Sequence, residues 1–68
     1  MMTTQDKLNA AYRARLKCQQ LTDVLVNMHM DITAASGSGH LIIEIETAVN
    51  KLQTEIHKNI DELEEELG

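Results

Sequence analysis

The side chains best suited to chemistry in this 68-residue chain are three histidines, one cysteine and eleven carboxylates. Such groups can bind a transition metal, but a structural zinc site needs four ligands, usually supplied as two close pairs of Cys or His. His40 and Glu44 stand one helical turn apart, yet Cys18 has no second cysteine, and no set of four ligands can be assembled. We therefore expect no metal and no other cofactor, and we interpret Cys18 as a core residue and the histidines as solvated.

Phosphate binding and nucleophilic catalysis are the next chemistries to consider. Ser36-Gly37-Ser38-Gly39 has the composition of a phosphate-binding loop, but no Lys-Ser/Thr follows it and no predicted strand precedes it. A flexible link between two elements is the better interpretation. The chain also offers no nucleophile with a base and a third residue to orient that base. We expect a protein that is not an enzyme and that works by binding.

Composition favours helices. The chain contains one Tyr, no Phe, no Trp and no Pro, whereas strands favour aromatic and β-branched residues and need frequent turns. A chain this short buries only about 60% of the surface that it exposes when unfolded. Because the single cysteine provides no disulfide within the chain, oligomerisation or partner binding is the expected source of further stability.

No apolar run approaches the roughly 18 residues of a membrane span. The first residues also lack the basic and apolar regions of a signal peptide. We therefore expect a cytoplasmic protein with no membrane association.

Apolar residues recur at steps of three and four on both sides of one glycine-serine break, which is typical of one face of a helix. The first stripe is Leu8, Ala11, Ala14, Cys18, Leu21, Leu25, Met28 and Ile32. The second stripe is Ile42, Ile45, Val49, Leu52, Ile56, Ile60, Leu63 and Leu67. This pattern predicts an all-α fold, a single domain over residues 1–68, with a helix at about 4–34, a loop at about 35–39 and a helix at about 40–67.

The ends of both helices carry recognisable signals. Thr3 or Thr4 ahead of the first helix and Ser38 ahead of the second are suitable N-caps, because a hydroxyl can accept a hydrogen bond from the free N–H groups of the first turn. Gly37 suits the left-handed position that closes a helix.

The two stripes match when they are paired in opposite directions around the loop. Each layer, such as Leu21 with Leu52 or Met28 with Ile45, joins residues whose two numbers add up to between 73 and 75. A nearly constant sum predicts an antiparallel helical hairpin, since every apolar layer of one helix then meets a layer of the other. Small residues near the start of the first helix face large ones near the end of the second, which keeps the volume of each layer even.

Charge is distributed in a way that agrees with the hairpin. Basic residues lie in the first half of the first helix: Lys7, Arg13, Arg15 and Lys17. Acidic residues lie toward the end of the second: Glu55, Asp61, Glu62, Glu64, Glu65 and Glu66. Each cluster is at the unfavourable end of its own helix dipole, and antiparallel packing would bring the two together so that their attraction compensates.

Several apolar residues belong to neither stripe. Those of the first helix fall within roughly 80° of one another, away from the seam: Tyr12, Leu16, Val26 and Met30. Others flank the loop: Val24, Leu41 and Ile43. Scattered surface apolar residues are common, but a seam of two helices rarely holds a domain of this size, so we predict that these seven form a dimer or partner interface. Two hairpins could bury them as a four-helix bundle, or a foreign helix could lie in the groove.

The expected function is therefore a small protein-interaction module, such as an adaptor, a chaperone-like factor or a regulator. It is expected to act as a self-associating hairpin whose partner is a protein rather than a nucleic acid. One alternative is RNA binding, with phosphates contacted by Lys7, Arg13, Arg15 and Lys17 and a base stacked on Tyr12. The net charge of −5 and the nearby acidic residues count against it. The other alternative is inhibition of a nucleic-acid-binding or other cellular enzyme by the acidic run at 62–66, whose ordinary interpretation is a solvated helix end.

The opening Met2-Thr3-Thr4-Gln5-Asp6-Lys7, the expected hairpin and the chain length resemble the Rop family of plasmid RNA-binding regulators, which are dimers of helical hairpins. The resemblance implies the same architecture and gives the RNA-binding alternative its form. It does not extend beyond those residues, and the glycine-serine loop differs from the tight turn of that family, so no site residues are carried over. Short hairpin co-chaperones of type III secretion share the outline without a matching motif.

Overall fold

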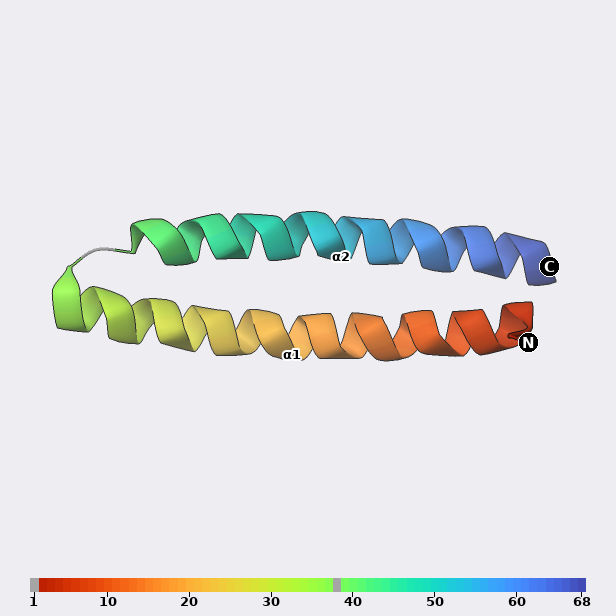
Figure 1. The fold of residues 1–68 in the computed structure, drawn as a ribbon, viewed down its shortest axis with the longest axis horizontal. Coiled ribbons are helices and arrows are strands. Elements are labelled where there is room, and N and C mark those ends of the chain that lie inside the picture. Colours follow the sequence, from red (N-terminus) through yellow and green to blue (C-terminus); the bar gives the residue numbers. More distant parts are fainter. Residues whose placement is uncertain (1, 38) are drawn as a thin grey trace.

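The computed structural model describes residues 2–37 and 39–68, and these form two long helices that lie side by side and run in opposite directions (Figure 1). Helix α1 spans Thr4–Ser36 and helix α2 spans His40–Leu67. No strand occurs in these two ranges, so the all-α prediction is confirmed. The two ends of the chain lie together at one end of the pair, and the link between the helices lies at the other (Figure 1).

Helix α1 begins and ends at the residues that its capping chemistry dictates. The N–H of Asp6 donates to Thr3 Oγ1 and the N–H of Thr3 donates to Asp6 Oδ2, both at 3.1 Å, which forms a capping box. At the other end Gly37 adopts φ 73° and its N–H donates to the carbonyl of Thr33 at 2.8 Å. The predicted roles of Thr3 and Gly37 are confirmed.

The helix continues to Ser36, two residues beyond the predicted end at 34. Alanine and serine at positions 35 and 36 are compatible with a helix, and Ser36 Oγ donates to the carbonyl of Ile32 at 3.0 Å. The first residue that leaves helical geometry is the left-handed glycine. The N-cap predicted at Ser38 lies outside the described residues, and Gly39 precedes α2 without a side-chain cap.

The helices bury a single line of side chains between them, here called the buried line. It consists of Leu8, Ala11, Cys18 and Leu25 from α1 and Ile42, Val49, Ile60 and Leu63 from α2. The four residues nearest the chain ends form one cluster and the four nearer the loop form another, with Ile56 packed against both. Each cluster joins the two predicted stripes in antiparallel register.

The rest of the two stripes is not buried. Leu21, Met28, Ile45 and Leu52 are 43–50% exposed, although the sequence placed them in inner layers of the seam. Leu67, which was paired with Leu8, is also exposed. The reason is geometric, because positions three residues apart are about 60° apart around a helix and the second of them lies at the edge of the contact. Both such positions are buried only near the chain ends, at Leu8 with Ala11 and at Ile60 with Leu63. The pair is therefore a slender body of 49 × 18 × 15 Å.

Neither α1 nor α2, searched over the described residues, combines the length and the apolar character that a helix needs to cross a membrane.

Candidate protein-interaction surface

One side of the buried line carries a shallow apolar groove of about 380 Å³ between the helices. It is lined by Ala14, Lys17, Cys18, Leu21, Leu52 and Ile56. Met28 follows Leu21 by seven residues and Ile45 precedes Leu52 by seven, so the same line of apolar side chains continues toward the loop. We call Ala14, Leu21, Met28, Ile45, Leu52 and Ile56 the groove face.

On the other side, the residues that directly border the buried line near its middle are polar. Leu21 and Thr22 are consecutive residues and thus about 100° apart around α1, so they fall on opposite sides of the line that joins Cys18 and Leu25. Thr22 Oγ1 donates to the carbonyl of Cys18 at 2.9 Å. A small hollow of about 30 Å³ separates the helices here, and its polar lining residues are Thr22, Glu46 and Asn50. We call Thr22, His29, Glu46 and Asn50 the histidine face.

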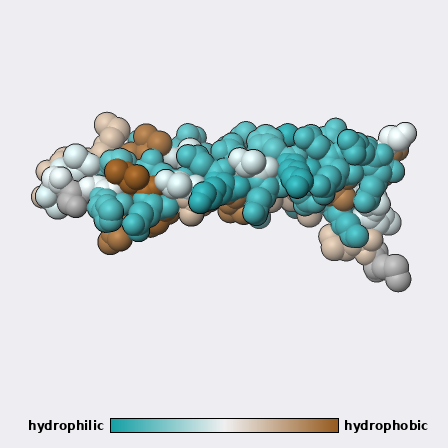
Figure 2. Space-filling view, turned by 90° about the horizontal axis from the view of Figure 1, so that it is seen from above, coloured by the Kyte–Doolittle hydropathy of each residue, from teal (hydrophilic) through white to brown (hydrophobic). Residues whose placement is uncertain are grey.

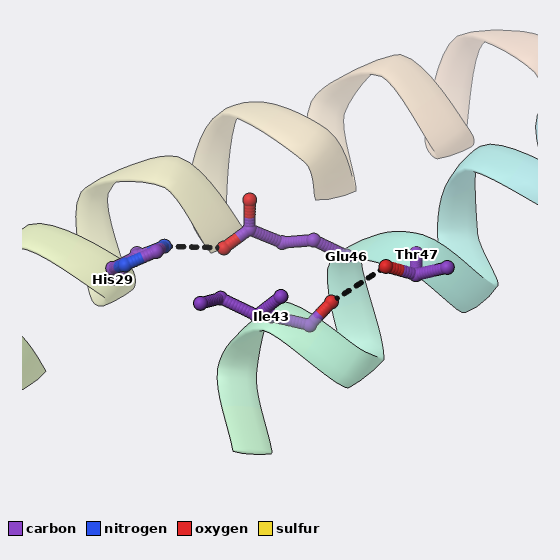
Figure 3. Close-up of polar contacts among 4 residues, drawn as sticks. All are labelled: His29, Ile43, Glu46 and Thr47. Carbon is purple, nitrogen blue, oxygen red and sulfur yellow. Dashed lines mark hydrogen bonds and ion pairs between the residues drawn. The ribbon is translucent and has the colours of Figure 1, made fainter. Parts of the chain in front are cut away.

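His29 and Glu46 link the two helices across this face. Figure 3 shows the imidazole of His29 directed at the carboxylate of Glu46, and the Nδ1 and Oε1 atoms share a hydrogen bond of 2.7 Å. Both side chains are about two-thirds buried, at 34% and 30% exposure. The interpretation of His29 as solvated was therefore wrong. The numbers 29 and 46 add up to 75, within the range of the apolar layers, and this signal could have found the pair.

The loop packs closely on the same histidine. A Cβ atom added to Gly39 would lie 2.9 Å from His29 Nε2, too close for a real contact. Glycine at this position therefore lets the chain pass the imidazole while its other nitrogen bonds to Glu46. His40, in contrast, is 80% exposed and lies 3.4 Å from Glu44 one turn along α2.

The structure separates the seven predicted interface residues into two groups. Six of them are 47–71% exposed and Tyr12 is half-buried. Val24 and Leu41 border the groove face. Val24 is seven residues, about two helical turns, after the groove residue Lys17, and Leu41 is eleven residues, about three turns, before the groove residue Leu52. The others lie on the side of the histidine face or beyond it: Tyr12, Leu16, Val26, Met30 and Ile43.

Apolar surface is concentrated at the loop end of the molecule. Figure 2, which views the pair from the side of α2, shows hydrophobic side chains gathered near the loop and a mostly hydrophilic surface toward the chain ends. The most exposed large apolar residues, Leu41 at 71% and Met30 at 66%, are within ten residues of Gly37.

The predicted RNA-contacting residues do not share one face. Arg13 and Arg15 are two residues apart and therefore about 200° apart around α1. The guanidinium of Arg15 lies over the ring of Tyr12, 5.1 Å from its centroid, which is a cation–π contact. Among the described residues no ion pair within 4.0 Å joins the basic cluster to the acidic one, so their expected attraction does not take the form of direct pairs.

Cys18 is buried, with its Sγ 4.0 Å from the carbonyl oxygen of Val49, which confirms its interpretation as a core residue. Over residues 2–37 and 39–68, no three or more His, Cys, Asp or Glu side chains gather as metal ligands would. Comparison of the chain with protein-family models, with curated proteins and with solved structures finds no match.

Proposed function

We propose that this chain is a non-enzymatic protein-interaction module whose working unit is a self-associated hairpin, with two copies packed as a four-helix bundle. The observation that carries the proposal is the groove face. Four large side chains on it are about half exposed although they belong to the same stripes as the buried line. Twelve large hydrophobic residues are exposed among those described, against eight hydrophobic residues that are buried.

Physical considerations support association as the role of this surface. Full burial of one Leu, Ile or Met side chain stabilises a protein by about 1.5–3 kcal/mol, so a half-exposed residue leaves roughly half of that unused. Small domains without disulfides or metals generally obtain the missing stability from oligomerisation. Helical hairpins do so by forming four-helix bundles, in which each helix contacts two neighbours instead of one.

The same proposal gives a role to the apolar residues outside the groove face. Leu16, Val26 and Met30 point away from the groove side of α1 and stay exposed when that face is covered. They are the predicted surface for a second, different protein, which would make the chain an adaptor, a chaperone-like factor or a small regulator. An amphipathic helix is the kind of segment that such a stripe accepts.

The alternative functions gain no specific support. RNA binding needs basic side chains that converge on one backbone, and Arg13 and Arg15 diverge around α1. The acidic run near the end of α2 is exposed, as the ordinary interpretation of a solvated helix end also expects.

Static light scattering of the purified chain over a wide concentration range tests the proposal. We expect a mass of twice the 7.6 kDa of one chain, with dissociation only at the lowest concentrations. Helical content followed by circular dichroism on the same samples shows whether the folded state depends on association. A folded protein with the mass of one chain at every concentration would overturn the proposal.

A further inference from the structure

We infer that the second copy covers the groove face and lies antiparallel to the first, so that Leu21 meets Leu21 and Leu52 meets Leu52 at the centre of the assembly. This inference rests on the proposed function and specifies its partner. The partner is a second copy of this chain, held on one named side of the hairpin, and the loop ends of the two copies lie at opposite ends of the bundle.

The seven-residue repeat indicates what kind of surface fits the groove face. Ala11, Cys18, Leu25 and Ile32 repeat every seven residues and face the other helix of the hairpin. Ala14, Leu21 and Met28 form a second line with the same period, three residues further on. Helices with two such lines pack by inserting side chains between those of neighbouring helices with the same repeat. In the single hairpin only the first line is used, and another hairpin of the same period is the matching occupant for the second.

Side-chain size favours the antiparallel arrangement. Leu21 and Leu52 are near the middle of α1 and α2, with Met28 and Ile45 toward the loop and Ala14 toward the chain ends. When two copies pack face to face in opposite directions, Met28 of one lies over Ala14 of the other, and the outer layers have equal volume. When the copies point the same way, both Met28 and both Ile45 gather toward one end of the groove, while the two Ala14 residues and the two Ile56 residues share the other end, so the outer layers differ in volume.

Cross-linking between introduced cysteines distinguishes the arrangements, because each brings different residues together. Cys18 is first replaced by Ala so that the introduced thiol is the only one, and a short bismaleimide is used as the reagent. We expect Leu21→Cys to link to itself, Met28→Cys not to link to itself, and a mixture of Met28→Cys with Ala14→Cys to link. Leu16→Cys is the matched control outside the groove face and should give no product. Circular dichroism of each variant confirms that it remains helical.

The outcomes also distinguish this inference from the proposed function. Linking of Met28→Cys with Ile45→Cys, in place of Ala14→Cys, would show copies pointing the same way and overturn the inference while self-association stands. A wild-type dimer in which only Leu16→Cys links would show that a different face is used, and it would likewise overturn the inference. A wild-type chain that stays monomeric would overturn both.

Discussion

The two sides of the buried line differ in how their side chains are satisfied within one chain. On the histidine face, Thr22 bonds to the backbone of α1 and His29 bonds to Glu46 of α2, so these three side chains find partners within one chain. On the groove face, Leu21 and Leu52 stay roughly half exposed beside an apolar groove. In a hairpin of two helices, polar side chains on the histidine face can form hydrogen bonds within the chain. The apolar side chains of the groove face have no third helix to cover them.

This contrast shows how one chain can hold two helices in a defined register and still leave apolar side chains exposed. The capping box at Thr3 and the left-handed Gly37 fix the ends of α1, and the hydrogen bond of His29 with Glu46 joins the two helices in one register. That register places the unused apolar line on a single side of the molecule. The proposed association therefore adds burial to a surface that is already arranged, and little ordering is needed when the copies meet.

The largest effect is expected from a charge on the groove face. Leu52→Asp should lower self-association by more than a hundredfold, because two aspartates would meet in an apolar contact at the centre of the proposed assembly and repel each other. Leu16→Asp is the matched control and should leave the mass unchanged. Light scattering with circular dichroism measures both mass and helicity, and where the hairpin needs its partner to fold, Leu52→Asp should also lose helicity. If Leu16→Asp dissociated the protein and Leu52→Asp did not, the contrast between the faces would be reversed.

A smaller effect is expected on the histidine face. Glu46→Ala removes a hydrogen bond between two side chains that are each about two-thirds buried. Partial exposure reduces its contribution, so the free energy of unfolding should fall by about 0.5–1 kcal/mol with no change in mass. Glu44→Ala is the control, since the contact of Glu44 with His40 is 3.4 Å long and largely exposed. Urea denaturation measures both variants at one protein concentration, and equal effects would show that the link between the helices contributes nothing of its own.

Much of the fold could be predicted from the sequence because its signals depend either on neighbouring residues or on a regular pairing of the two halves of the chain. The Thr3 cap and the Gly37 terminator depend on a few neighbouring residues. The antiparallel register followed from the nearly constant sum of paired residue numbers, and it also contained the pairing of His29 with Glu46. That pair was missed because only apolar layers were considered.

The candidate site was harder to predict for a physical reason. Leu21 and Leu25 have the same side chain and belong to the same stripe, yet Leu25 is 5% exposed and Leu21 is 43% exposed. Which of the two lines is buried depends on the number of neighbouring helices, and the stripe alone does not specify that number. The predicted interface at Leu16, Val26 and Met30 therefore stays a prediction for a different partner, and the groove face emerged only from the packed hairpin.

Small-angle X-ray scattering tests the central claim, face-to-face pairing of two hairpins, most directly. A single hairpin is 49 Å long with a Cα radius of gyration of 15.6 Å. We predict a particle with the mass of two chains whose largest dimension stays close to that of one hairpin while its cross-section widens. A particle with the mass of one chain, or one with doubled mass and nearly doubled length, would contradict the account.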